Sequence, residues 1–141
     1  MKNNKLNKIK ISIVTVCFNS AKTIEQTIKS VINRSYKNIE YIVIDGGSTD
    51  GTLDIIRKYE PYITHLVSES DQGIYDAMNK GIKASEGELI AFINSDDWYH
   101  EDAMLHFAEA YKRLPADVLF GDIITVNEVA MKNTHLMQAL M

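Results

Sequence analysis

The chain has 141 residues, of which 45% are hydrophobic and 24% are charged, and these values are close to those of ordinary soluble globular domains. The length fits one domain that buries roughly two thirds of the surface of its unfolded form, and the composition argues against a fibrous or disordered protein. A single cysteine, Cys17, excludes an internal disulfide and a multi-cysteine metal site, and it indicates a reducing compartment.

The charge is unevenly distributed along the chain. Four lysines give the first ten residues a charge of +4, so the rest of the chain is acidic although the total is only −4. We expect residues 1–10 to form a solvated basic tail, with attraction to an anionic membrane surface as the minor alternative. An acidic body disfavours nucleic acid as the main ligand, because a phosphate backbone requires clustered Lys and Arg. No apolar run approaches the roughly 20 residues of a membrane span.

The first two predicted elements are a buried strand over residues 11–18 and a helix over residues 23–33. The strand is an apolar run that contains β-branched residues. At the start of the helix, Thr23 and Gln26 have the spacing of a capping box, in which each side chain bonds a free backbone N–H of the first turn. The apolar side chains expected on one face of the helix are Ile24, Ile28, Val31 and Ile32.

The rest of the chain continues to alternate between strands and helices. Strands are predicted over residues 39–45, 63–67 and 88–93, and helices over residues 53–59, 73–84 and 101–113. In the helix over 73–84 the helical spacing runs through Ile74, Ala77, Met78, Gly81 and Ile82. A fifth strand is expected over 118–120. Beyond it, residues 122–129 suggest a further strand and residues 130–141 a helix, although neither segment has a clear stop signal.

This alternation predicts an α/β fold with a mostly parallel sheet that is covered by helices, because right-handed crossovers place helices on the faces of such a sheet. In parallel sheets of this kind, ligands bind outside the carboxyl ends of the strands. Polar side chains follow three of the predicted strands, namely Asn19, Asp45, and the pair Asp96 and Asp97. We therefore expect them to lie at one edge of the sheet.

The segment "NSDD" places four oxygen-bearing side chains directly after a strand. Hard cations such as Mg²⁺ and Mn²⁺ take one or two protein carboxylates together with phosphate oxygens, so Asp96 and Asp97 are candidate ligands. The alternative is an ordinary helix cap or solvated turn. Asp45, in "DGGSTDG", is either a nucleotide contact or the acceptor of an Asx turn. No P-loop and no GxGxxG motif is present, which disfavours a conventional ATPase and a classical dinucleotide dehydrogenase.

Two long stretches together resemble a known family. The stretches "ISIVTVCFNSAKTIEQTIKSVINRSYKNIEYIVIDGGSTDGT" and "SESDQGIYDAMNKGIKASEGELIAFINSDD" are similar to the nucleotide-sugar-binding half of family 2 glycosyltransferases, which have the GT-A fold. The resemblance covers roughly residues 9–125 and rests on several ordered motifs, which makes it far more specific than the acid pair alone.

The resemblance implies roles for particular residues. The segment from Val16 through Phe18 to Asn19, together with Asp45, would border the nucleotide base. Asp96 would contact the ribose or sugar of the donor, and Asp97, with Asp96, would hold a Mn²⁺ or Mg²⁺ ion that bridges the diphosphate. Asn79, in "GIYDAMNKG", would line the donor site, and its alternative is an exposed polar position on a helix.

Two positions depart from the usual pattern of the family. Gly46 stands where a second acid commonly follows Asp45, and Asn94 stands where the later acidic motif often begins with Asp. Each departure removes one carboxylate from the expected site, so a modest affinity for the metal is predicted.

The implied function is metal-dependent, inverting transfer of a sugar from a nucleotide diphosphate sugar, with UDP as the default nucleotide and GDP and dTDP as the alternatives. The acceptor would be a glycan or a lipid-linked molecule of bacterial surface-polysaccharide synthesis, and the protein would be cytoplasmic. We expect residues 11–125 to form the donor-binding domain and 126–141 an incomplete segment without an acceptor half. No general base is assigned. Asp122 is the one late acid near the end of a predicted strand, and this role is not given to it. The alternative is a donor-binding module without transfer activity, and self-association is expected from exposed apolar surface.

Overall fold

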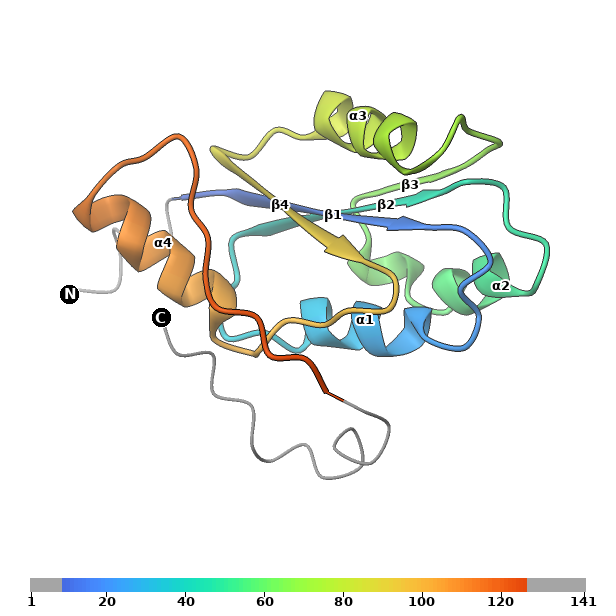
Figure 1. Ribbon diagram of the computed structural model, residues 1–141, viewed down its shortest axis with the longest axis horizontal. Coiled ribbons are helices and arrows are strands. Elements are labelled where there is room, and N and C mark those ends of the chain that lie inside the picture. The colour runs from blue at the N-terminus through green and yellow to red at the C-terminus, as the bar shows by residue number, and fades with distance from the viewer. Residues whose placement is uncertain (1–8, 127–141) are drawn as a thin grey trace.

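The computed structural model describes residues 9–126 and shows four strands and five helical segments (Figure 1). The strands are β1 (Ile11–Cys17), β2 (Ile39–Asp45), β3 (His65–Ser68) and β4 (Leu89–Asn94). The helices are α1 (Ile24–Ile32), α2 (Thr52–Arg57), the short 3₁₀ helix η3 (Glu60–Tyr62), α3 (Ile74–Ala84) and α4 (Ala103–Arg113). These bounds lie within two residues of the predicted ones, which is the usual uncertainty of helix and strand ends.

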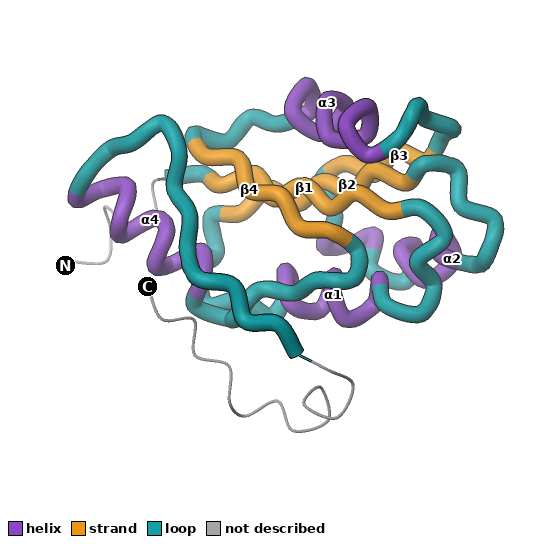
Figure 2. Tube along the Cα trace, viewed as in Figure 1, coloured by secondary structure: helices purple, strands orange, loops and turns teal. Residues whose placement is uncertain are grey.

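The strands form one parallel sheet in the order β3-β2-β1-β4. Helix α3 covers one face of the sheet, and α1, α2 and α4 lie on the other (Figure 2). The predicted α/β fold with a helix-covered parallel sheet is therefore confirmed. Of the described helices, none combines the length and the apolar character needed to cross a membrane.

The two central strands are buried along their whole length, because helices cover them on both sides. Every residue of β1 is buried, and six of the seven in β2 are. Their side chains alternate between two apolar clusters: Ile13 and Val43 pack toward α1 and α4, whereas Val14 and Ile42 pack toward α3. A strand that is buried on both faces needs a continuous apolar sequence rather than an alternating one, which explains the unbroken apolar run of β1.

Helix α3 approaches the sheet through its smallest residues. Ala77 and Gly81 are buried, whereas Ile74 and Ile82 are 48% and 44% exposed. A Cβ atom at Gly81 would lie 2.3 Å from the Val14 Cγ1 atom of β1, so only glycine permits this contact. The helix predicted from this spacing is confirmed, and of its apolar positions Ala77 and Gly81 are the buried ones, whereas Ile74 and Ile82 are exposed.

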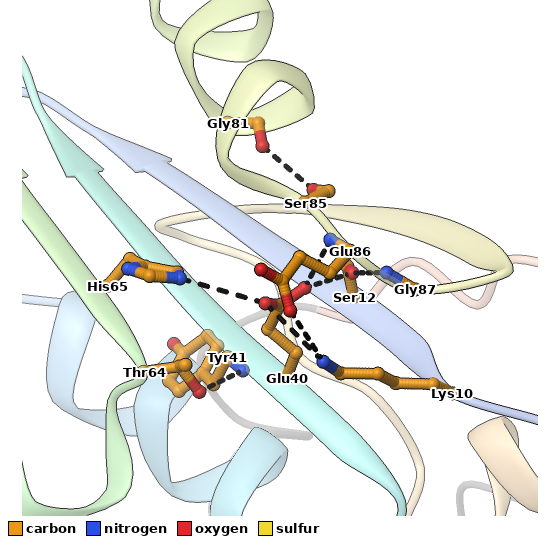
Figure 3. Close-up of polar contacts among 10 residues, drawn as sticks. All are labelled: Lys10, Ser12, Glu40, Tyr41, Thr64, His65, Gly81, Ser85, Glu86 and Gly87. Carbon is orange, nitrogen blue, oxygen red and sulfur yellow. Dashed lines mark hydrogen bonds and ion pairs between the residues drawn. The ribbon is translucent and has the colours of Figure 1, made fainter.

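A cluster of polar side chains around the buried Glu40 closes the amino ends of the strands (Figure 3). We call Lys10, Ser12, Glu40, His65 and Glu86 the amino-edge cluster. The Glu40 carboxylate is 2% exposed and accepts hydrogen bonds from the Ser12 hydroxyl at 2.5 Å and the Glu86 backbone N–H at 2.8 Å. The Lys10 Nζ and His65 Nε2 atoms lie 3.8 and 3.7 Å from its Oε1 atom. Such bonds compensate for burying the charge, which would otherwise be costly.

Two local predictions are wrong: the side-chain cap of α1 and the fifth strand. The Thr23 side chain forms no capping bond at α1, and the turn is closed instead by the Gln26 and Ile24 backbone N–H groups, which donate to the Thr23 and Ser20 carbonyls. The predicted strand over 118–120 is absent, as is any strand over 122–126. A strand forms only where a neighbour pairs with its backbone, and none of the strand pairings of the described residues includes this segment.

Several predictions concern residues outside the described part of the chain. They are the end of the expected strand over 122–129, the helix over 130–141 and most of the basic tail, of which only residues 9 and 10 are described. The expected self-association also stays a prediction. The described surface does include apolar side chains on and beside the edge strand β4, where Ile90 is 41% and Phe92 is 37% exposed.

Candidate functional site

The carboxyl ends of β1, β2 and β4 are level with one another. Cys17 is paired with Asp45, and Val16 with Asn94, so the residues that follow these strands meet at one edge (Figure 1). We call this the carboxyl edge. The topology therefore brings the predicted residues after the strands together, including both acids of "NSDD".

The segment from Asn94 to Asp97, which we call the acid turn, is fixed to its surroundings by hydrogen bonds. The Asp97 N–H donates to the Asn94 carbonyl at 3.1 Å, which closes the turn. The Thr27 hydroxyl of α1 donates to the Asp97 carbonyl at 2.7 Å, and the hydroxyls of Ser20 and Ser95 lie 2.7 Å apart. The acid turn is therefore held through its backbone by α1 and through the Ser95 side chain by the β1–α1 loop.

Tyr99, two residues after the acid turn, connects this part of the chain to α1 and β4 by hydrogen bonds. Its N–H donates to the Ser30 hydroxyl at 3.2 Å, and its own hydroxyl donates to the Phe92 carbonyl at 2.6 Å. Burial, together with the negative charge of Asp97, raises the pKa of Tyr99 to about 12, so its hydroxyl stays protonated as a donor at neutral pH. Tyr99 thus ties the loop after the acid turn to both α1 and β4.

The two carboxylates of the acid turn are exposed and form no ion pair with any described residue. Partial burial and then the charge of Asp96 raise the pKa of Asp97, and a hydrogen bond with Asn94 opposes this only in part. A raised pKa shows that the negative charge is not compensated by neighbouring groups. A bound cation would supply that compensation.

Hard oxygen donors of this kind fit Mg²⁺ or Mn²⁺. Within residues 9–126, no group of three or more His, Cys, Asp or Glu side chains is placed to hold an ion by itself. Asp96 and Asp97 would therefore provide only part of a coordination shell. Phosphate oxygens and water would complete it, which is the usual arrangement for Mg²⁺.

Asp45 is fully buried, and its oxygens are occupied by internal partners. It accepts hydrogen bonds from the Ser48 N–H at 3.1 Å and the Ser68 hydroxyl at 2.7 Å, and also from the Ser48 hydroxyl and the Cys17 thiol. The bond from the Ser48 N–H, three residues further on, gives Asp45 a local structural role of the kind that the sequence left as the alternative, although an Asx turn would use the N–H two residues on. A direct contact between Asp45 and a nucleotide stays a prediction, and its observed role is to hold the loops after β1, β2 and β3 together.

The residues predicted at the end of β1 differ in exposure. Val16 is buried in the cluster under α3, whereas Phe18 is 62% exposed. Asn19 has a φ of +49°, a left-handed conformation that Asn tolerates better than most residues. Its side-chain oxygen accepts from the Thr49 N–H at 2.9 Å, so it ties the β1–α1 loop to the loop after β2. Their contacts with a ligand stay predictions.

Asn79 lies on the exposed side of α3, near the middle of the helix. Ala77 and Gly81 face the sheet, so the side chain at position 79 lies on another face of the helix. No hydrogen bond or ion pair of the described structure joins Asn79 to the carboxyl edge. This position agrees with the alternative of an exposed polar residue, and its role in donor binding stays a prediction.

A groove of about 1290 Å³ adjoins the acid turn and passes the edge of β4. Asp96 and Asp97 line it, together with residues of α1, the start of α4 and the segment over 120–126. Asp122 also lines this groove, as does His100. Its volume is sufficient for a ligand beside the two carboxylates.

Sequence reasoning missed the residues that immobilise this edge, above all Thr27, Ser95 and Asp50. The Asp50 carboxylate accepts from the Ala21 N–H at 3.1 Å and from the Thr52 N–H at 3.0 Å. One usable signal was the polar Thr27 on the apolar face of α1, because a buried hydroxyl requires a hydrogen-bond partner. The partner itself depends on the fold.

Comparisons with known proteins agree with this geometry. Residues 12–139 match the family described as "Glycosyl transferase family 2". A PGL/p-HBAD biosynthesis glycosyltransferase of Mycobacterium bovis is 32% identical over 118 residues, which are 80% of this chain and 46% of that protein. The chain thus spans less than half the length of this relative.

Solved structures give the same picture. TarS of S. aureus, crystallised with UDP-GlcNAc, matches with a TM-score of 0.69 and 28% identity over 74% of this chain and 32% of that one. The mannosyltransferase PcManGT of Pyrobaculum calidifontis, solved with GDP-Man and Mn²⁺, matches with a TM-score of 0.66 and 25% identity over 77% of this chain and 33% of that one.

Proposed function

The chain belongs to glycosyl transferase family 2, and on that premise we propose that it binds a nucleotide diphosphate sugar at the carboxyl edge and transfers the sugar with inversion. The donor is a UDP-sugar, and the acceptor is a glycan or a lipid-linked molecule of surface-polysaccharide synthesis. One observation carries the proposal: at the end of β4, Asp96 and Asp97 present exposed carboxylates that form no ion pair with any described residue. The related TarS structure with UDP-GlcNAc and the PcManGT structure with GDP-Man and Mn²⁺ support it.

The acid turn would hold a Mn²⁺ or Mg²⁺ ion, mainly through Asp97. When bound, such an ion neutralises the charge that develops on the departing diphosphate. Asp96 would orient a ribose or sugar hydroxyl as a hydrogen-bond acceptor. The bond from Thr27 to the Asp97 carbonyl and the bond between the Ser20 and Ser95 hydroxyls fix the acid turn before the donor arrives, which reduces the reorganisation that binding requires.

Inverting transfer also requires a base that removes the proton of the acceptor hydroxyl as it attacks the sugar. No described residue is assigned to this role. Asp122 lines the groove beside Asp96 and Asp97, and its side chain is exposed.

The second candidate function is a module that binds the donor without transferring the sugar. One observation favours it: none of the described residues is assigned as the general base that transfer requires. For either function we propose a cytoplasmic protein that binds no nucleic acid. In both cases the basic tail is the part expected to contact a membrane.

Calorimetric titration of UDP and UDP-glucose with and without Mn²⁺ tests the proposal, first on the unmodified chain and then on Asp97→Ala. The matched control is Asp54→Ala, which removes an exposed carboxylate of α2 that pairs only with Arg57 at 3.9 Å. We expect Mn²⁺-dependent binding that falls by at least about tenfold in Asp97→Ala and is unchanged in Asp54→Ala, in line with the loss of a metal ligand.

Binding that is equally strong without the metal, or unaffected by Asp97→Ala, would contradict the metal site. If UDP, GDP and dTDP sugars all fail to bind, donor binding itself is wrong. Assays of sugar transfer to acceptors then separate the enzyme from the binding module, because only the enzyme releases the nucleotide diphosphate in the presence of an acceptor.

A further inference from the structure

Gly46, directly after β2, is a glycine for a reason other than its backbone. Its φ is not positive, unlike that of Gly47 next to it, so other residues could adopt its conformation. A Cβ atom at position 46, however, would lie 2.6 Å from the Oδ2 atom of Asp71. The missing side chain is therefore required by the carboxylate of Asp71, which fills the space above the end of β2.

Asp71 is held in this place by the loop between β3 and α3. Its Oδ1 atom accepts from the Gly73 N–H at 2.9 Å. The loop is itself anchored, because the Glu69 N–H donates to the Asp45 carbonyl at 3.0 Å and the Glu69 carboxylate pairs with Lys80 of α3 at 2.9 Å. The position of the Asp71 carboxylate is thus fixed by the same loops that form the carboxyl edge.

The second oxygen of Asp71 has no partner in the described structure. No hydrogen bond or ion pair of residues 9–126 ends on Oδ2. The ammonium group of Lys80 is paired with Glu69 and Asp76. Its pKa is raised mainly by the hydrogen bond with Glu69, and the charge of Asp71 adds only a minor contribution. Burial and then Asp45 raise the pKa of the Cys17 thiol at the end of β1, and Asp71 contributes least. A fixed acceptor therefore points at the region where β1 and β2 end.

An ionised carboxylate only accepts hydrogen bonds, and this property discriminates among nucleobases. Uracil presents a ring N3–H donor, whereas cytosine presents an unprotonated ring nitrogen at the same position. That nitrogen would be repelled by a carboxylate. Guanine presents two adjacent N–H groups and would use both oxygens, but here Gly73 already occupies Oδ1. One free oxygen matches the single ring N–H that uracil shares with thymine, and it therefore favours the uracil of the proposed UDP donor over cytosine and guanine.

We propose that Asp71 determines the base specificity of the donor site by accepting a hydrogen bond from the N3–H of uracil. This inference rests on the proposed function, because it requires a nucleotide at the carboxyl edge. It also gives the departure at Gly46 a physical meaning: the carboxylate absent from position 46 is replaced in the same space by one from the β3–α3 loop.

The test compares UDP, CDP and GDP by calorimetry in saturating Mn²⁺. The proteins are the unmodified chain, Asp71→Asn, Asp71→Ala and, as a matched control, Asp54→Asn on α2. Asparagine keeps an acceptor for the Gly73 N–H and also offers a donor to the ring nitrogen of cytosine. We expect the unmodified chain to prefer UDP. Compared with it, Asp71→Asn should bind UDP about tenfold more weakly and CDP about tenfold more tightly, because one hydrogen bond to the base is lost with uracil and gained with cytosine.

Asp71→Ala should weaken UDP without improving CDP, and Asp54→Asn should change neither. An unaltered ratio of UDP to CDP affinity in Asp71→Asn would overturn the inference while leaving the proposed function intact, provided that the unmodified chain binds UDP. Tighter binding of GDP or CDP than of UDP by the unmodified chain would also overturn it. Failure of every nucleotide to bind the unmodified chain would instead contradict the proposed function.

Discussion

At the amino edge of the sheet the Glu40 carboxylate is buried and bonded, whereas at the carboxyl edge Asp96 and Asp97 are exposed and form no ion pair with any described residue. Both sites lie on the same four strands. Burial, which would by itself raise the pKa of Glu40, is outweighed by the Glu86 N–H, the Ser12 hydroxyl and the charges of Lys10 and His65, so that its pKa is lowered. The pKa of Asp97 is raised.

The difference separates carboxylates that stabilise the fold from those that are available to a ligand. The amino-edge cluster compensates the charge of Glu40 with groups of the chain itself. In the acid turn, the hydrogen bonds from Thr27 and to Asn94 involve the backbone of Asp97. No described residue forms an ion pair with the carboxylates of Asp96 and Asp97. We infer that substitutions at the first site change stability and that substitutions at the second change binding.

The largest expected effect is that of Glu40→Ala. It leaves the Ser12 hydroxyl and the Glu86 N–H without their acceptor, and we expect the free energy of unfolding to fall by about 3 kcal/mol, as when one partner of a buried charged network is removed. Guanidinium chloride denaturation measures the change. Nucleotide binding by the folded fraction should be unaltered.

Glu86→Ala is the matched control for this prediction, because the Glu86 side chain is 73% exposed and pairs with the same Lys10 at the surface. Its removal should cost no more than about 0.5 kcal/mol. Equal losses in the two variants would show that burial does not distinguish Glu40 from its surface neighbour, and the comparison of the two edges would then lose its basis.

An intermediate effect is expected from pH. The folded-state pKa of Glu40 is lowered, so its contribution to stability is present above the unfolded pKa and is lost as the pH falls through the folded pKa. Asp97 has the opposite sign, because its raised pKa means that protonation favours the folded state. We expect the guanidinium chloride concentration at the midpoint of unfolding to decrease as the pH is lowered from about 6 to about 3. This decrease should be less steep in Glu40→Gln than in the unmodified chain.

Asp97→Asn should not make stability less dependent on pH in this range. The reason is that protonation of Asp97 at low pH stabilises the folded state, and the variant lacks this stabilising effect. If Glu40→Gln has the same pH profile as the unmodified chain, the lowered pKa of Glu40 is not the source of the acid sensitivity.

The smallest expected effect is that of Asp97→Asn on stability at neutral pH. Removing one of two adjacent charges should raise the free energy of unfolding by about 0.3 kcal/mol, since solvent screens this exposed pair. The gain should shrink as salt is added, because ions screen the remaining repulsion. Asp54→Asn is the control, since it loses an ion pair with Arg57 and should give no gain. A clear loss of stability in Asp97→Asn would mean that its carboxylate has a structural partner.

Much of this fold was predictable because its central strands are apolar over their whole length. The runs over 11–17 and 39–45 can be buried only in a sheet that is covered on both sides. The segment over 118–120 has similar residues but no partner strand among the described residues, and the pattern of side chains alone does not reveal whether a partner exists.

The site was predictable in its position and less so in its details. The order of strands and loops brings Asn19, Asp45 and Asp97 to one edge, as topology requires. The internal bonding of Asp45 depends on Ser48 and Ser68, which belong to two different loops. Likewise, the fit of Gly46 to Asp71 depends on how two loops meet in space. Contacts of this kind become visible only when the register of the strands is known.

The contact between Gly81 and Val14 has a consequence for the evolution of this chain. A Cβ atom at position 81 would lie 2.3 Å from the Val14 side chain, so the two positions share one fixed volume between α3 and β1. An alanine at position 81 should become acceptable only with a smaller residue at position 14. Related sequences should therefore vary at these two positions together, and Gly81→Ala should recover stability when it is combined with Val14→Ala.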